Sequence, residues 1–281
     1  MQSWFFLALF AGFASALNVW LAKVLVDKKL DPVLLGSSVH LLGGLACLLT
    51  LPFFPTRFDL SPLLGLGLLG MGLVYTLGNS LYFLALAQTQ LSEIDLFLRS
   101  SSFWTFLFGV LLLSEPFGLK TVLGALLIVG SVFLLSQQRW PLRFSRAQLL
   151  ALGAAMVFGL GNVIDKALSG HFDALSYSTV NLILTGVGML AIARPKLRTL
   201  QTRALWGRGA WGIGLTFALT QVLIILAFAA GGTAGGVILV AQVRLIILMS
   251  LGILVLKEYS RLYLKLLAAL CMLGGLVTLY L

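Results

Sequence analysis

Charged side chains are scarce in this sequence, and acidic ones are the scarcest. Only 10% of the 281 residues are charged and nine are acidic, while 60% are hydrophobic. Soluble domains carry about 25% charged residues, so this composition excludes an ordinary water-soluble domain. The mean hydropathy is +1.06. The apolar runs extend for about 20 residues without strict alternation, which favours membrane-spanning helices over a β-barrel.

Cysteine and recognisable catalytic motifs are also few. Cys47 and Cys271 fall within predicted spans and have no CxxC or Cys/His neighbour, so we expect neither a disulfide nor a metal site. The sequence contains no nucleotide-binding loop and no nucleophile–base–acid set, so we expect no cofactor and no enzyme activity. The net charge of +10 does not indicate nucleic-acid binding, because the basic residues lie in short loops between spans.

Ten apolar stretches are long enough to cross a membrane as helices. The first lacks the basic start of a signal peptide and is expected to be a mature helix. The predicted fold is therefore an all-α membrane protein with ten transmembrane helices. The expected spans are 3–25, 33–53, 63–86, 91–113, 116–135, 147–168, 174–193, 210–230, 235–256 and 262–281.

Corresponding polar residues recur in the two halves of the chain. Lys23 closes the first span and Lys166 closes the sixth, while Glu115 and Glu258 each separate the last two spans of their half. The second member of each pair follows the first by the same 143 positions (166 from 23, and 258 from 115). This regularity predicts an internal repeat.

Each predicted repeat holds five spans. Because five is odd, the second copy must be inverted in the membrane, and inverted repeats place the substrate near the midplane between the copies. We expect a first repeat over 1–138, a linker loop over 139–146 and a second repeat over 147–281.

Two short motifs resemble the drug/metabolite transporter superfamily, and within it the ten-helix EamA-type transporters. In both motifs a glutamate precedes a glycine-bearing fifth helix of the repeat. The resemblance implies export of amino acids or other metabolites, or exchange of phosphorylated sugars. One departure is that Ser101 and Arg244 stand where the family often has a proline. The motif residues are Leu113-Ser114-Glu115 with Gly124 and Gly130, and Leu256-Lys257-Glu258 with Gly274 and Gly275.

Two arginines lie inside predicted spans, where a charged side chain is costly and usually functional. Arg99 has Asp95 four residues before it, on the same helix face, so two readings stay open: a neutralised structural pair, or an anion-binding group held by Asp95. Arg244 has no acidic residue three or four positions away. A guanidinium suits a carboxylate or phosphate because it donates parallel hydrogen bonds.

Other polar side chains within the spans complete the candidate site. For each of them alone, hydrogen bonding between helices is the alternative to ligand contact. Asp165 has a further alternative, an ion pair with a loop lysine. The candidates for substrate binding are Arg244, Arg99, Tyr75, Asn79, Tyr82, Trp104, Gln221 and Gln242, and those for coupling or gating are Asp95, Glu93, His40, Asn18, Trp20, Asn162 and Asp165.

The sequence therefore predicts a secondary transporter of a small anionic or zwitterionic metabolite, with amino-acid export as the first choice and alternating access as the mechanism. Exchange of a phosphorylated metabolite is the second choice. A membrane subunit without transport activity is the rival from another class, and it would have a closed, dry interface between the halves. The expected partners are a small-molecule substrate and the lipid bilayer. The coupling ion stays open, and the proton is the candidate for it.

Loop charges and family resemblance disagree on orientation. One set of loops carries fourteen basic residues, and the other carries only Arg57, Lys120 and Lys166. The positive-inside rule then places both termini outside, whereas the resemblance implies termini inside. With either orientation we expect an integral, multi-pass protein of the plasma membrane, which in a bacterium is the inner membrane. The oligomeric state stays open.

Overall fold

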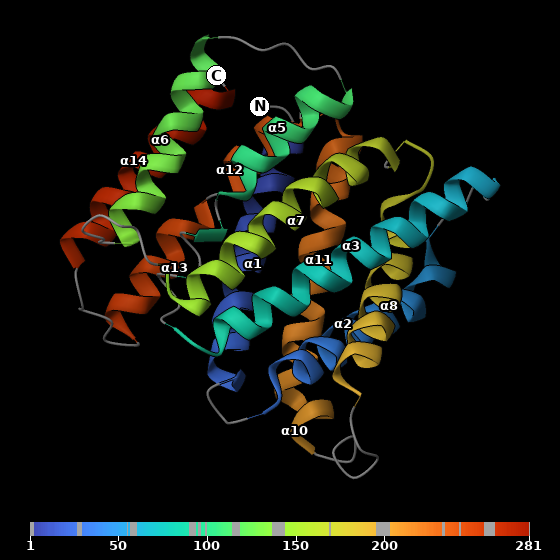
Figure 1. The fold of residues 1–281 in the computed structure, drawn as a ribbon. Helices are drawn as coiled ribbons and strands as arrows, with labels where there is room; N and C mark the ends of the chain where they lie inside the picture. Colours follow the sequence, from blue (N-terminus) through green and yellow to red (C-terminus); the bar gives the residue numbers. More distant parts are fainter. Residues whose placement is uncertain are drawn as a thin grey trace.

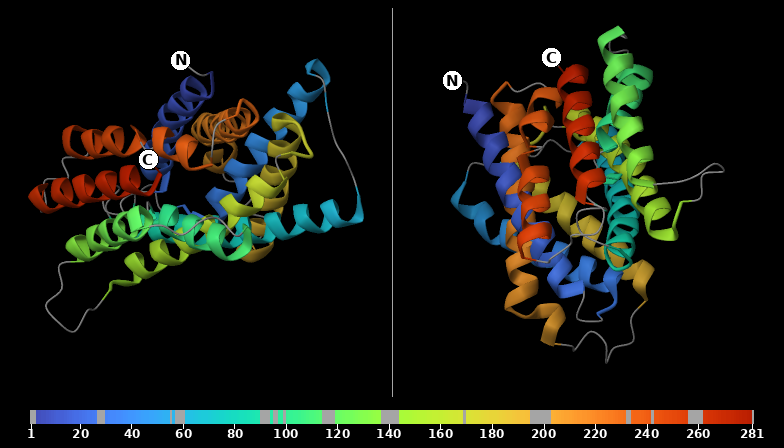
Figure 2. Two further views of the ribbon diagram at one scale, coloured as in Figure 1. Left: turned by 90° about the horizontal axis from the view of Figure 1, so that it is seen from above. Right: turned by 90° about the vertical axis from the view of Figure 1, so that its left-hand side faces the viewer.

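A computed structural model shows the chain as a bundle of helices (Figure 1). Within the described residues the two ends of the chain lie at the same end of the bundle (Figures 1 and 2). The structure describes residues 3–26, 30–54, 56, 61–89, 94, 97–98, 100–113, 119–136, 144–168, 170–194, 203–231, 234–241, 243–255 and 262–280.

The helices follow the apolar stretches of the sequence closely. In the first half they are α1 (Ser3–Val26), α2 (Pro32–Thr50) with the 3-10 turn η1 (Leu51–Phe53), α3 (Pro62–Leu86), α5 (Ser101–Leu113) and α6 (Leu119–Ser136). In the second half they are α7 (Arg146–Leu168), α8 (Ala174–Ala193), α10 (Arg203–Trp206), α11 (Arg208–Ala229), α12 (Ala234–Ala241), α13 (Val243–Leu254) and α14 (Leu262–Tyr280).

Side-chain caps explain where several helices begin. The Asp31 carboxylate accepts a hydrogen bond from the backbone of Leu34 at 2.8 Å, and Pro32 occupies the first helical position of α2. Ser61 and Pro62 start α3 in the same way. A polar N-cap followed by proline satisfies backbone donors that have no partner within the helix.

Six of these helices are long and apolar enough to cross a membrane: α1, α2 with η1, α3, α7, α8 and α11. Two shorter apolar helices, within α5 and α14, accompany them in the part of the chain that the structure describes. On α1 the aromatic side chains Phe6, Phe10 and Phe13 are 44–59% exposed, as expected for a surface that faces lipid. The prediction of an all-helical, multi-pass membrane protein is confirmed. The count of ten spans and the inverted repeat stay predictions.

Helices of the first half pack mainly on helices of the second. α2 lies against α8, and α6 lies against α14 at one edge of the bundle (Figures 1 and 2). α1 packs on α11 as α7 packs on α3, and α1 contacts α12 and α13 as α7 contacts α5. Each of these contacts has a counterpart with the halves exchanged. This pattern supports the predicted two-fold relation.

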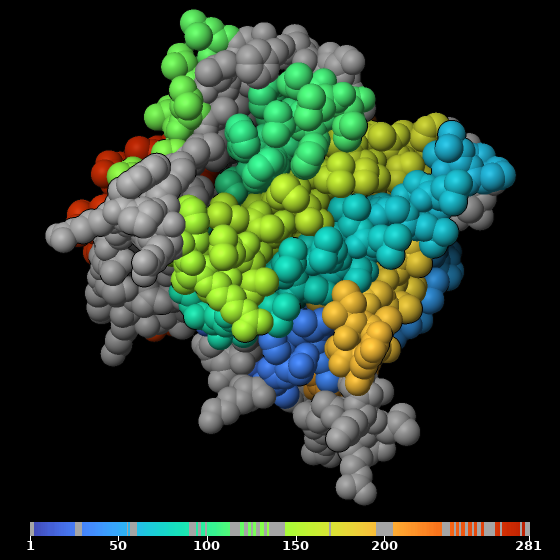
Figure 3. Space-filling view, in the orientation of Figure 1, coloured from blue at the N-terminus to red at the C-terminus, as the bar shows by residue number. Residues whose placement is uncertain are grey.

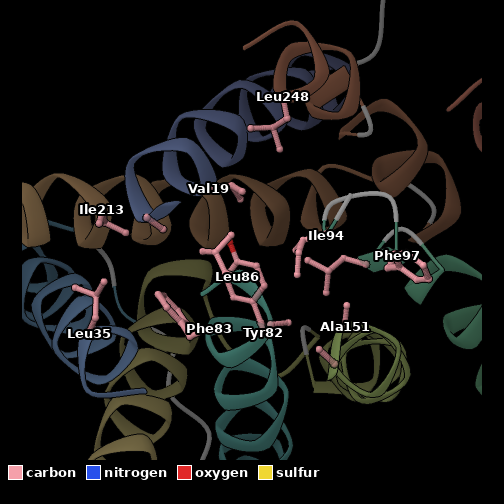
Figure 4. Close-up of a cluster of buried hydrophobic side chains, with 14 of the residues drawn as sticks. Val19, Leu35, Tyr82, Phe83, Leu86, Ile94, Phe97, Ala151, Ile213 and Leu248 are labelled. Atoms are coloured by element: carbon pink, nitrogen blue, oxygen red, sulfur yellow. The ribbon is translucent and has the colours of Figure 1, made fainter. Parts of the chain in front are cut away.

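The largest buried apolar cluster lies where the two halves meet. Tyr82, Phe83 and Leu86 of α3 converge there with side chains from both halves, among them Leu35 and Ile213 (Figure 4).

The crossing of α2 and α11 depends on glycine. A Cβ atom added to Gly43 would lie 2.7 Å from the carbonyl oxygen of Gly214, and one added to Gly214 would lie 2.8 Å from the carbonyl oxygen of Val39. Small residues allow membrane helices to approach this closely. The two backbones are therefore in direct contact.

Lys23 does not behave as the loop charge that the orientation count assumed. It lies in the last turn of α1, only 9% exposed, and its Nζ donates to the carbonyl oxygens of Leu86 at 3.0 Å and Thr89 at 2.9 Å. It thereby caps the carboxyl end of α3, where a positive charge is favourable. Without Lys23, thirteen basic residues remain on one side against three on the other, so the count still places both termini outside.

Replacing Lys23 with methionine is expected to lower the free energy of unfolding by about 2 kcal/mol, because two carbonyl oxygens lose a charged donor in a buried position. Lys166, its counterpart in the second half, is exposed, so Lys166→Met is the matched control and should change stability by less than about 1 kcal/mol. Thermal unfolding in detergent measures both. Equal effects would contradict the capping role of Lys23.

Candidate functional site

A cavity of about 220 Å³ lies among the helices of both halves. The side chains of α3 and α7 form a continuous surface on the face shown in Figure 3. The cavity is lined by Ala11, Ser15, Asn18, Val19, His40, Tyr75, Asn79, Tyr82, Leu98, Ser101, Phe158, Asn162, Asn181, Leu182, Thr185, Phe217, Thr220, Gln221, Ile224, Ile238, Ala241 and Arg244.

Arg244 provides the positive charge of this cavity. Its Nη1 donates a hydrogen bond to the Ser15 hydroxyl of α1. One turn further along α1, Asn18 donates to the carbonyl oxygen of Ile213 at 2.8 Å and to the Thr216 hydroxyl at 3.3 Å. α1 thus ties α13 to α11 through polar contacts and holds the guanidinium at the cavity wall.

The described lining of the cavity contains no carboxylate. Among the described residues that line the cavity, Arg244 is the only permanently charged side chain, and the others are amides, hydroxyls, one histidine and apolar groups. In a low-dielectric interior, a single positive charge attracts an anion strongly. The arrangement is suited to the carboxylate or phosphate of a small polar molecule.

His40 is buried in the wall between α2 and α11. Its Nδ1 lies 2.7 Å from the carbonyl oxygen of Gly36, and its ring centroid lies 4.5 Å from that of Phe217. Because a carbonyl oxygen only accepts, Nδ1 carries the hydrogen of this contact. The bond lies within α2, one turn back from His40, and gives the ring a structural partner.

Asp165 of α7 lies behind the wall, 4% exposed. Tyr75 of α3 donates to its Oδ2 at 2.6 Å, and Tyr177 of α8 donates to its Oδ1. Both carboxylate oxygens thus accept from tyrosine hydroxyls. The alternative of an ion pair with a loop lysine stays a prediction. Gln221 of α11 interacts with the same carboxylate.

The sequence analysis missed a polar stripe on α8. Tyr177, Asn181 and Thr185 are spaced by four residues and so share one helix face, which turns toward the site. Thr185 donates to the Asn181 amide oxygen at 3.2 Å. The spacing was visible in the sequence, and Ser15, one turn before Asn18, was equally visible.

Most of the predicted candidates lie around this one cavity. Asn18, His40, Tyr75, Asn79, Tyr82, Asn162, Gln221 and Arg244 line it. Asn162 also donates to the Thr105 hydroxyl at 2.9 Å, which links α7 to α5. Asp165 is one contact behind the wall.

Two tryptophans lie elsewhere. Trp104 packs on Gly159 where α5 crosses α7, and its ring stacks on Phe108 with 6.2 Å between centroids. Trp20 packs against the large apolar cluster. Glu93, Asp95, Arg99 and Gln242 fall outside the described residues, so their predicted roles stay predictions.

Comparison with known proteins supports a transporter. Residues 2–137, just under half of the chain, match the EamA-like transporter family. No curated protein matches. One solved structure, described as the crystal structure of a protein, is similar over 96% of this chain and 95% of that chain, with 18% identity and a TM-score of 0.53. At that identity the similarity concerns the fold alone.

Proposed function

We propose that this protein is a secondary transporter that moves a small anionic or zwitterionic metabolite, such as an amino acid, through the cavity between its halves. The observation that carries the proposal is Arg244, a permanent positive charge on the wall of a cavity whose described lining contains no carboxylate. The match of residues 2–137 to a transporter family supports transport as the activity.

The size and lining of the cavity favour a small ligand with an apolar part. About 220 Å³ accommodates a molecule of amino-acid size, not a large multi-ring compound. Asn79, Asn181 and Gln221 offer amide donors and acceptors, while Phe158 and Phe217 cover the remainder. A mixed lining of this kind orients a ligand by a few polar contacts within a mostly apolar pocket.

Alternating access is the mechanism that the helix packing supports. Contacts between the halves occur in exchanged pairs, α1 with α11 and α7 with α3, as expected for two repeats that rock around a central site. Export is the direction that the family resemblance implies. Exchange of a phosphorylated metabolite is the alternative substrate class, since a guanidinium binds phosphate equally well. A subunit without transport activity is disfavoured by the presence of a cavity with a charged and several polar side chains between the halves.

A thermal-shift screen of the purified protein tests the substrate class. The panel contains amino acids, organic acids, sugar phosphates and nucleobases. A ligand present at 100 times its dissociation constant stabilises the folded protein by about 2.7 kcal/mol, so binding raises the unfolding midpoint measurably. We expect a carboxylate or phosphate compound to raise it and the uncharged nucleobases to leave it unchanged. Stabilisation by nucleobases alone would contradict the proposal.

A further inference from the structure

Asp165 is a carboxylate inside the membrane-spanning part of the protein, and the hydrogen bonds that it accepts from described residues come from neutral groups. Its hydrogen-bond partners among the described residues are the hydroxyls of Tyr75 and Tyr177, and the Gln221 amide interacts with the same carboxylate without a hydrogen bond of normal geometry. A buried carboxylate is costly unless it is paired with a cation or neutralised. These partners satisfy its oxygens without cancelling its charge.

We propose that Asp165 is a proton-binding site of the transporter, reached from the cavity through Tyr75 and Gln221. The step is a protonation: a proton from water in the cavity binds one carboxylate oxygen, and the charge at this position changes from minus one to zero. No other bond forms or breaks. The proton site itself does not depend on the proposed function. Only its consequence, the coupling of proton binding to substrate binding, rests on that function.

Protonation of Asp165 changes the hydrogen bonds of the two tyrosine hydroxyls, and this change extends to the cavity wall. Both donate to the carboxylate here, one to each oxygen. When one oxygen carries a proton, it becomes a donor, and the hydroxyl facing it must accept or turn away. Tyr75 and Gln221 line the cavity, whereas Asp165 does not. Proton binding therefore rearranges donors on the cavity wall.

The surrounding charges set the sign of the coupling. The groups that face Asp165 are Tyr75 from α3, Tyr177 from α8 and Gln221 from α11, and its neighbour Lys166 on α7 is exposed. His40 and Arg244 belong to the cavity wall. Loss of the negative charge at Asp165 leaves Arg244 better able to hold an anion. Since coupling between two binding sites is reciprocal, an anion in the cavity favours protonation of Asp165.

Infrared difference spectroscopy of the purified protein tests the site without any substrate. Spectra are recorded as the pH is lowered from 8 to 5, and the carboxylic-acid carbonyl band is compared between the wild type and the isosteric variant Asp165→Asn. We expect a band that grows reversibly in the wild type and is absent from the variant. An unchanged band in Asp165→Asn overturns the proposal.

Two further variants separate this result from a change in folding. Asp173 caps α8, and asparagine is an equally good cap, so Asp173→Asn should keep the Asp165 band. Tyr177→Phe removes a donor that favours the ionised form, so at a given pH its band should be larger than in the wild type. A band in Tyr177→Phe equal to that of the wild type contradicts the proposed role of the hydroxyl. A pH-dependent band together with a ligand screen that finds no anion would leave the proton site standing and the proposed substrate class refuted.

Discussion

Replacing Arg244 with glutamine is expected to weaken binding of a carboxylate or phosphate ligand by about 30- to 700-fold, which corresponds to about 2–4 kcal/mol. Arg244 is the only permanent charge among the described residues of the cavity wall, and Ser15 holds it in place. Glutamine keeps a polar side chain, although a shorter one, and loses the charge. The loss should therefore appear in ligand affinity and leave the packing of α13 on α1 intact.

Ligand affinity of purified Arg244→Gln is measured by titration, with the compound that stabilises the wild type. Arg208→Gln is the matched control, because Arg208 is exposed at the start of α11 and is not part of the cavity wall. The control should bind like the wild type. If Arg244→Gln binds as tightly as the control does, the anion site lies elsewhere.

Gly43→Leu is expected to destabilise the protein by about 3 kcal/mol or more. An added Cβ would lie 2.7 Å from the carbonyl oxygen of Gly214, which belongs to the backbone of α11 and cannot move without the helix. Overpacking of an interior costs about 1–3 kcal/mol even where side chains can adjust. Here a backbone has to shift, and Asn18 and Gln221, which depend on α11, would shift with it.

Gly65→Leu supplies the comparison for this variant. Gly65 lies on α3, also in a membrane-spanning helix, and an added Cβ would meet nothing within 4 Å. It should therefore unfold close to the wild-type temperature, while Gly43→Leu should unfold at a lower temperature or fail to accumulate as a monodisperse species. Size-exclusion profiles recorded after stepwise heating distinguish them. Similar profiles for the two variants would rule out a close α2–α11 crossing.

The sequence predicted several helices well because local signals mark their first residues, such as the caps Asp31, Ser61 and Asp173. The span expected over 174–193 is α8 to the residue, begun by the Asp173 cap. The spans expected over 91–113 and 235–256 each include residues outside the described part of the chain, so their full extent stays a prediction.

The sequence predicted that Arg244 faces a cavity or a partner, but it did not predict that the partner is Ser15. An arginine in an apolar stretch predicts a cavity or a partner, and the structure places it at a cavity beside Ser15. Ser15 is 229 residues away, and such a pairing depends on how α1 packs against α13. The same holds for Asp165, whose tyrosine partners come from two other helices.

Some local features were readable and were overlooked. Tyr177, Asn181 and Thr185 follow each other at helical spacing within one predicted span, so they had to share a face. The role of Trp104, in contrast, could not be read from the sequence, because an aromatic side chain in a span suits both a ligand site and a helix crossing. Only the packing of α5 on Gly159 of α7 distinguishes the two.

The central claim is transport by alternating access. It is tested most directly by measuring from which side of the membrane a reagent can reach the cavity. In a variant without Cys47 and Cys271, Ser101 on the cavity wall is replaced by cysteine and exposed to a membrane-impermeant maleimide from either side of oriented vesicles. Ser145→Cys, exposed just before α7, is the one-sided reference. The account predicts that Ser101→Cys reacts from both sides, that ligand protects it, and that Ser145→Cys reacts from one side only. Reaction of Ser101→Cys from a single side under all conditions, or from neither side, would contradict it.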